Sequence, residues 1–111
     1  MNLSNNQRKL IHSLHQKKHR YESGLFIVEG VKGVEEAMGA GAQVSLIAVQ
    51  EGRESAGLSA LIQKAEQKDI EVVLANEKDV ATIKTTDHFP GVLAVVQMPE
   101  PEIDEMDGVI I

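Results

Sequence analysis

Four short apolar runs, separated by segments of helical periodicity, constrain the fold more than any other feature of this sequence. The runs cover residues 25–28, 44–49, 72–74 and 92–96. Their length and their branched aliphatic side chains are typical of strands buried on both faces of a sheet. Strands that alternate with helices predict an α/β domain, here a three-layer α/β/α sandwich with a small sheet. The pattern does not determine the order of the strands.

The first helix is predicted to begin after Ser4, which forms a capping box with Gln7, and to run to about Lys18. Because a helix repeats every 3.6 residues, its side chains divide into two faces. The apolar face consists of Leu3, Leu10, Ile11 and Leu14. The opposite face is a basic, histidine-rich ridge, predicted to face solvent, that consists of Arg8, His12, His15 and His19.

Spacing and capping residues predict three further helices and one loop. The second helix contains Val31, Val34 and Met38 and ends at the glycine-rich residues 39–41. The third is marked by Leu58, Leu61, Ile62 and Ala65. Asn76 is predicted to cap a short helix that runs to Ile83, and a polar loop follows over residues 84–90.

Composition excludes several classes of protein. With 111 residues the chain can form one domain with its own core. It has no cysteine, which excludes a disulfide framework, a thiolate zinc site and a cysteine nucleophile. No apolar run approaches the length of a membrane-spanning helix, and the first residues lack the pattern of a signal peptide. We therefore expect a cytoplasmic protein that does not contact membranes.

The charge of the chain is distributed unevenly. Residues 1–20 contain five basic and no acidic side chains, whereas the remaining residues contain six basic and seventeen acidic ones. These parts carry +5 and −11, which sum to the net charge of −6. A negative total does not exclude nucleic acid, because binding depends on where charge lies. The N-terminal region is the expected site of contact with an anionic partner.

The composition changes again near Met98. Residues 99–107 are rich in proline and acidic side chains and are predicted to be an acidic linker. Residues 108–111 are apolar and are interpreted as the first strand of a following domain. An alternative interpretation makes them a last edge strand of the same sheet. The domain itself is predicted to span residues 1–98.

Several segments together resemble one enzyme family. The segments SNNQRKLIHSLHQKKHR, FIVEG and FPGVLAVVQMPEP, with a helix that ends in a glycine-rich turn, resemble the SpoU or TrmH-type RNA ribose methyltransferases. The resemblance covers residues 4–98 as the N-terminal substrate-binding domain. It implies a fold like that of ribosomal proteins that bind kink-turn RNA. In the whole enzyme it also implies a C-terminal trefoil-knotted domain that binds S-adenosylmethionine (AdoMet) and forms a homodimer.

The candidate RNA-binding residues lie in two places. Five form the basic N-terminal region: Arg8, Lys9, Lys17, Lys18 and Arg20. Contacts from these residues to phosphates would release counterions. The alternative is that they are simply a solvated helix face. Two interpretations stay open for His12, His15 and His19, which could be RNA contacts or neutral surface residues. A metal site at His15 and His19 lacks a third ligand, so no metal is expected.

The second place is the strand-to-helix corner after Glu29. The resemblance carries Gly30 and Lys32 over as RNA contacts, since the corresponding corner touches RNA in kink-turn-binding proteins. A purely structural glycine is the alternative, with Glu29 bonded to Arg20 or to the backbone. Two interpretations also stay open for Phe89, which could stack on a base or fill space in the core.

No catalytic or cofactor-binding residue is predicted in this chain. The expected function is to bind structured, ribosomal or transfer RNA and to position one ribose for a methyltransferase domain. A stand-alone RNA- or ribosome-binding module is the alternative, and a protein-interaction domain with an acidic surface is a third.

Overall fold

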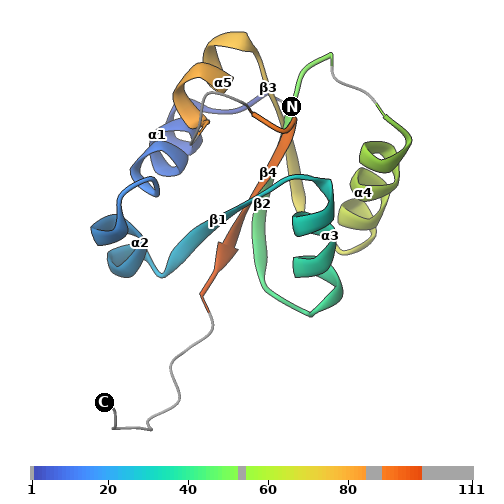
Figure 1. Cartoon of the computed structure of the whole chain (residues 1–111), viewed down its shortest axis with the longest axis horizontal. Helices are drawn as coiled ribbons and strands as arrows, with labels where there is room; N and C mark the ends of the chain where they lie inside the picture. Colours follow the sequence, from blue (N-terminus) through green and yellow to red (C-terminus); the bar gives the residue numbers. More distant parts are fainter. Residues whose placement is uncertain (1, 53–54, 85–88, 99–111) are drawn as a thin grey trace, which may run out of the picture.

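The computed structural model describes residues 2–52, 55–84 and 89–98 and shows one sheet between two layers of helices (Figure 1). In chain order the elements are α1 (Asn5–Ser13), α2 (Lys17–Ser23), β1 (Leu25–Glu29), α3 (Val31–Gly39), β2 (Val44–Gln50), α4 (Ala56–Gln67), β3 (Glu71–Ala75), α5 (Glu77–Ile83) and β4 (Val92–Gln97). None of these helices is long and apolar enough to cross a membrane. The predicted linker and the strand at residues 108–111 lie outside the described residues.

The sheet has the order β1-β4-β2-β3. The last strand, β4, lies between β1 and β2 and is antiparallel to both, whereas β2 and β3 are parallel. The N-terminal segment runs along β3, where the Leu3 amide donates a 2.8 Å hydrogen bond to the Leu74 carbonyl. At the opposite edge of the sheet lies β1, which connects α2 to α3 and has a neighbouring strand on one side only.

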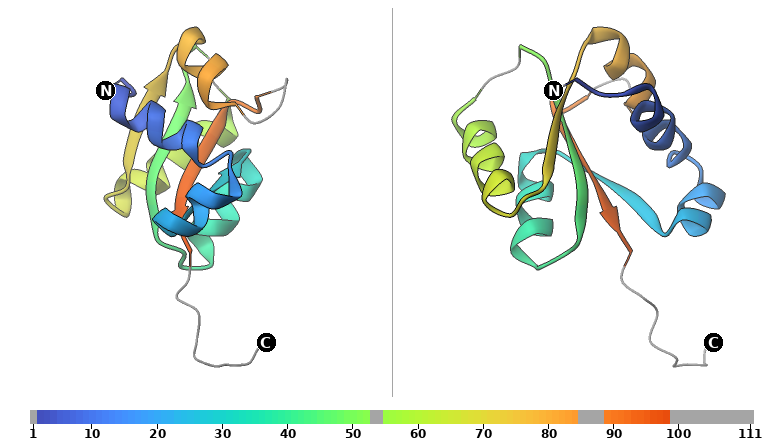
Figure 2. Two further views of the ribbon diagram at one scale, coloured as in Figure 1. Left: turned by 90° about the vertical axis from the view of Figure 1, so that its left-hand side faces the viewer. Right: turned by 180° about the vertical axis from the view of Figure 1, so that it is seen from behind.

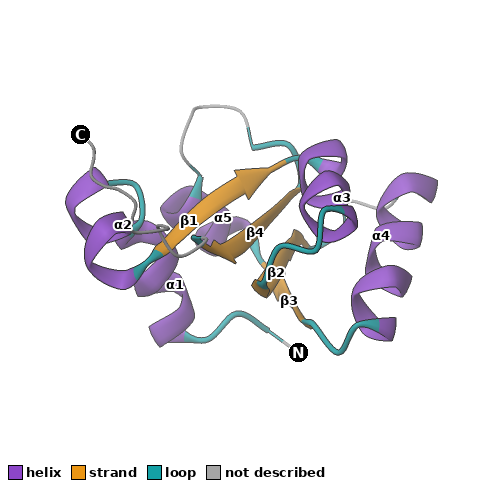
Figure 3. Ribbon diagram, turned by 90° about the horizontal axis from the view of Figure 1, so that it is seen from below, coloured by secondary structure: helices purple, strands orange, loops and turns teal. Residues whose placement is uncertain are grey.

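Each face of the sheet has its own core. On one face Ile11 of α1, Leu14 at the end of α1 and Ile83 of α5 pack against β4. Their partners on that strand are Leu93 and Val95. On the other face α3 and α4 cover the sheet, and their core is built from Val34, Met38, Leu58, Leu61, Ala65 and the strand residues Ile47, Val49, Val92, Ala94 and Val96. The view from behind and the view from below separate these layers (Figures 2 and 3). The predicted three-layer α/β/α class is therefore confirmed.

Local signals located most elements correctly. Asn76 accepts a 2.9 Å hydrogen bond from the Asp79 amide, and the Asp79 carboxylate accepts one from the Asn76 amide, so the predicted cap of α5 is confirmed as a capping box. Ser4 and Gln7 form the predicted capping box of α1. The four predicted strands are all present, each one to two residues longer than predicted.

The prediction of one helix to about Lys18 is wrong. The helix ends at Ser13, and a second helix begins at Lys17. Gln16 between them has extended backbone angles (φ −102°, ψ 132°), and the Ser13 hydroxyl donates to the Leu10 carbonyl. A serine hydroxyl that bonds the preceding turn competes with continued helix. His19 therefore lies on a different helix from His12 and His15, and the predicted ridge is interrupted.

Strand β1 is also less buried than predicted. All five of its residues are half-buried, whereas residues 92–96 of β4 are fully buried. The reason is topological: β4 has a strand on both sides, and β1 has one on a single side. A short apolar run cannot distinguish a central strand from an edge strand.

Candidate nucleic-acid interface

Arg8, a predicted phosphate contact, is held within the protein. Its Nη1 lies 2.7 Å from Oδ1 of Asp79, and its Nη2 donates to Oδ1 of Asn5. Asp79 is 3% exposed and also forms the capping box of α5. Because a buried carboxylate needs a cationic or hydrogen-bonding partner, the Arg8 guanidinium serves first to neutralise Asp79 and to join α1 to α5.

His12 and His15 both contact the end of α5, with His12 exposed and His15 half-buried. Nδ1 of His12 lies 3.2 Å from the Thr82 carbonyl oxygen, and Nε2 of His15 lies 2.9 Å from that of Ile83. A carbonyl only accepts hydrogen bonds, so each ring nitrogen donates. The two rings meet edge to face with centroids 5.1 Å apart. The first part of the predicted ridge is thus a packing surface for the last turn of α5, where free carbonyls need donors.

Arg20 fixes the bend between α1 and α2. Its Nη1 donates to the carbonyls of Leu14 and His15, at 3.0 and 3.2 Å. These carbonyls lie where α1 has ended, so they have no partner from a continuing helix. Arg20 is half-buried and borders a shallow hollow that Phe26, Ile27 and Glu29 also line. This guanidinium therefore sets the direction in which α2 leads into β1.

The remaining cations of the N-terminal region are exposed. Lys9 lies on α1, and Lys17 and Lys18 open α2. The Lys17 ammonium lies 5.8 Å from the centre of the Tyr21 ring, which is itself 68% exposed. In the same two helices the only acidic residue is Glu22, whose carboxylate lies 3.3 Å from Nδ1 of His19. Helices α1 and α2 thus present free positive charge beside an exposed aromatic ring. Tyr21 is not among the residues predicted from charge, and its spacing of four residues from Lys17 on a helix is the sequence signal that points to it.

The corner at Gly30 lies at the far end of β1 from α2. A five-residue strand separates the two places by about 16 Å, so the candidate residues do not form one cluster. Gly30 has a φ of +89°, a conformation that favours glycine, and a Cβ built on it would meet nothing within 4 Å. Backbone geometry alone therefore requires this glycine. Lys32 is exposed in the first turn of α3.

Phe89 belongs to the core. It is 5% exposed and packs in the cluster that includes Ile83 and Leu93. The interpretation of Phe89 as a core residue is confirmed, and stacking on a base would require it to leave that core. The neighbouring residues 85–88 lie outside the described part of the chain. Within the described ranges, no three His, Asp or Glu side chains come close enough together to hold a metal ion.

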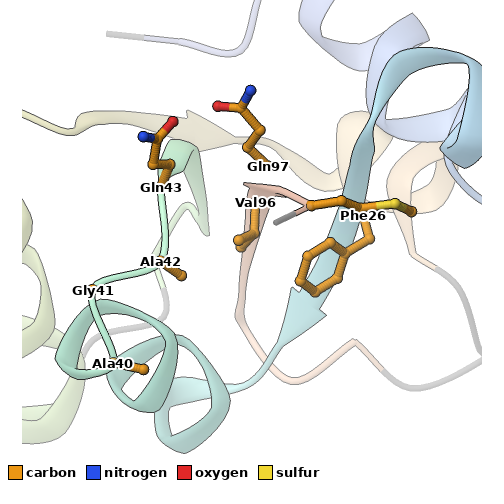
Figure 4. A pocket seen from close by; sticks show the side chains of 8 residues that line it. Phe26, Ala40, Gly41, Ala42, Gln43, Val96 and Gln97 are labelled. Atoms are coloured by element: carbon orange, nitrogen blue, oxygen red, sulfur yellow. The ribbon is translucent and has the colours of Figure 1, made fainter. Parts of the chain in front are cut away.

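An uncharged hollow of about 470 Å³ lies where β4 ends (Figure 4). It is lined by Phe26, Ala40, Gly41, Ala42, Gln43, Val96, Gln97 and Met98. Figure 4 shows the Phe26 ring beside Val96, with the carboxamides of Gln43 and Gln97 projecting to the same side. Its polar side chains are the neutral carboxamides of Gln43 and Gln97, so this hollow offers a phosphate no ionic partner.

A comparison with protein families assigns most of the chain to a known group. The family model of the MRM3-like substrate binding domain matches residues 5–94. The chain belongs to this family. A search of curated protein sequences gives no match.

Solved structures agree with the family assignment. An rRNA methyltransferase from Sinorhizobium meliloti is 28% identical, with a TM-score of 0.72 over 93% of this chain and 38% of its own. An RNA methyltransferase of the TrmH family from Porphyromonas gingivalis, described as putative, is 28% identical, with a TM-score of 0.68 over 91% of this chain and 39% of its own. The SpoU methyltransferase AviRb from Streptomyces viridochromogenes is 22% identical, with a TM-score of 0.73 over 90% of this chain and 35% of its own, and shows the fold alone. The chain thus spans less than two fifths of these proteins.

Proposed function

We propose that this chain is the RNA-binding part of an AdoMet-dependent 2′-O-ribose methyltransferase that acts on ribosomal RNA. The match of residues 5–94 to a substrate-binding family carries the proposal. The S. meliloti relative supports ribosomal RNA as the substrate class. A second structure, of AdoMet-bound rRNA methyltransferase from the same organism, supports AdoMet as the methyl donor of the full-length enzyme.

In this proposal the phosphates of structured RNA contact the exposed lysines of α1 and α2. Lys9, Lys17 and Lys18 are the direct contacts, because all three are exposed and lie where acidic residues are scarce. Arg8 and Arg20 act mainly by positioning these helices, since both are bonded within the protein. Gly30 and Lys32 provide a second, separate contact at the other end of β1. Such contacts fix the orientation of the RNA without reading its sequence.

The rest of the enzyme is proposed to follow this domain. Residues 99–107 would serve as an acidic linker, and residues 108–111 would begin a knotted domain that holds AdoMet and forms a homodimer in the cytoplasm. The domain described here would contribute by positioning. Holding one ribose near the methyl donor makes the reaction effectively intramolecular, which lowers its entropic cost.

Fluorescence anisotropy with a labelled ribosomal RNA hairpin tests the RNA-binding part of the proposal. We expect log Kd to depend on log salt concentration, and each of Lys17→Gln and Lys18→Gln to reduce the slope by about 0.7–0.9, the value for one lost phosphate contact. Lys64→Gln is the matched control, because it removes the same charge from α4 on the other face of the sheet. Slopes that equal that of the unmodified protein in both α2 variants would contradict the proposed surface.

The enzyme part has a separate test. If the reading frame continues beyond Ile111 with a further domain of about 150 residues, and the whole protein transfers a methyl group from AdoMet to RNA, the proposal holds. A frame that stops there would instead favour the stand-alone RNA-binding module.

A further inference from the structure

We propose that Tyr21 is a stacking platform for an unpaired base of the bound RNA. The inference rests on the proposed RNA-binding function and specifies how a base, as distinct from a phosphate, is held. Tyr21 is the most exposed large hydrophobic side chain in the part of the chain that the structure describes. Aromatic rings on single-stranded RNA-binding surfaces hold bases in this way, with little dependence on sequence.

The exposed Tyr21 ring contributes little to the stability of the fold. Helix α2 has no buried residue, and Tyr21 belongs to neither core cluster. Within the described residues its hydroxyl has no hydrogen-bond partner, and the Lys17 ammonium lies over its ring. Since an aromatic ring contributes to stability by leaving water, a ring that stays 68% exposed contributes little to the fold.

The surroundings of the ring suit a nucleotide. Lys17 and Tyr21 are four residues apart on α2, so they share one face of the helix. The ammonium lies over the ring at 5.8 Å, and the 68% exposure of Tyr21 gives a base access to the ring. Lys17 and Lys18 can then neutralise the phosphates on either side of the stacked nucleotide. A cation beside an aromatic ring supplies both of the contacts that single-stranded RNA requires.

The composition of the chain gives this inference a direct optical test. Tyr21 is the only tyrosine, and there is no tryptophan, so tyrosine emission reports on this one ring. We would titrate the protein with two RNAs of equal length, a hairpin with an unpaired adenosine loop and a fully paired duplex. N-acetyltyrosinamide in the same RNA solutions corrects for light absorbed by the RNA. The looped hairpin is expected to quench Tyr21 emission, and the duplex to quench it much less.

Variants separate stacking from charge. Tyr21→Leu is expected to weaken binding of the looped hairpin about five- to hundredfold, the range for loss of one aromatic–base stack, with little change for the duplex. Tyr21→Phe keeps the ring and is expected to bind as the unmodified protein does, as is the Lys64→Gln control. The thermal unfolding midpoint should be unchanged in both Tyr21 variants, because the ring is outside the core.

The possible results distinguish this inference from the function on which it rests. If the looped hairpin binds without quenching and Tyr21→Leu binds it equally well, stacking is overturned and RNA binding stands. If the unmodified protein binds neither RNA at low salt, both the inference and the proposed function are overturned.

Discussion

The ion pair between Arg8 and Asp79 yields the sharpest prediction of the structure. Replacing Arg8 by Gln removes a 2.7 Å charge-assisted contact to a carboxylate whose side chain is 5% exposed. Asp79 would keep its bond from the Asn76 amide and lose the one cationic partner that it has among the described residues. Breaking a fully buried pair costs about 3–5 kcal/mol. The Arg8 side chain is 33% exposed, so water can replace part of the contact, and we expect a loss of about 1.5–3 kcal/mol.

Urea unfolding followed by circular dichroism measures this loss. For a domain of this size each kcal/mol corresponds to about 4–8 °C in thermal midpoint. Lys9→Gln is the matched control, because it removes the same charge from an exposed position on the same helix, and its effect should stay within about 0.5 kcal/mol. A double-mutant cycle with Asp79→Asn should show that the effects of the two changes are not additive.

The same variant tests whether Arg8 is a phosphate contact. At a temperature where Arg8→Gln is folded, we expect its affinity for RNA to fall less than that of Lys17→Gln. Unchanged stability together with a large loss of RNA affinity would refute the argument, since Arg8 would then act on the RNA and not on Asp79.

Three further predictions concern the scaffold, and urea unfolding checks each of them. Gly33→Ala should destabilise the protein by about 1–3 kcal/mol through overpacking, because the new Cβ would lie 2.9 Å from Cγ1 of Val28. The control Gly39→Ala places a Cβ that meets no neighbour and should cause no loss of stability. Equal effects of the two variants would contradict this prediction. Arg20→Gln should cost about 1–3 kcal/mol by leaving the carbonyls of Leu14 and His15 without their donor, and a neutral result would mean that the bend between α1 and α2 does not depend on Arg20. Phe89→Ala should cost about 3–5 kcal/mol as a core truncation, and a loss of RNA affinity in a fully stable Phe89→Ala protein would restore the stacking interpretation.

The features predictable from sequence were those encoded by nearby residues. The capping boxes at Ser4 and Asn76 involve partners three residues away, and the strands are short continuous apolar runs. The order of the strands was not predictable, because β1 pairs with β4 across more than sixty residues of chain. The same limit explains the open position of β1, which exposes residues that looked like a central strand.

The candidate site shows the same division. The exposed lysines were identified from charge alone. Lys9 lies on the amphipathic first helix, whereas Lys17 and Lys18 lie on a second helix that has no buried residue. The role of Arg8 could not be identified, because Asp79 lies 71 residues further along the chain. The bend at Leu14–Gln16 was missed although its partners are near in the chain, because neither the Ser13 hydroxyl bond to the Leu10 carbonyl nor the Arg20 bonds to the carbonyls of Leu14 and His15 follow from the apolar spacing. Positive residues in a run are therefore not equivalent, and tertiary contacts decide which of them are free.

A map of amide chemical shifts tests most directly whether α1 and α2 form the RNA-binding surface. The protein would be labelled with nitrogen-15 and titrated with the looped RNA hairpin at low and moderate salt. We expect the largest shifts in residues 9–24, a smaller group at residues 30–33 and almost none in α4. Shifts that centre on α4, or on the uncharged hollow at the end of β4 without α2, would contradict it.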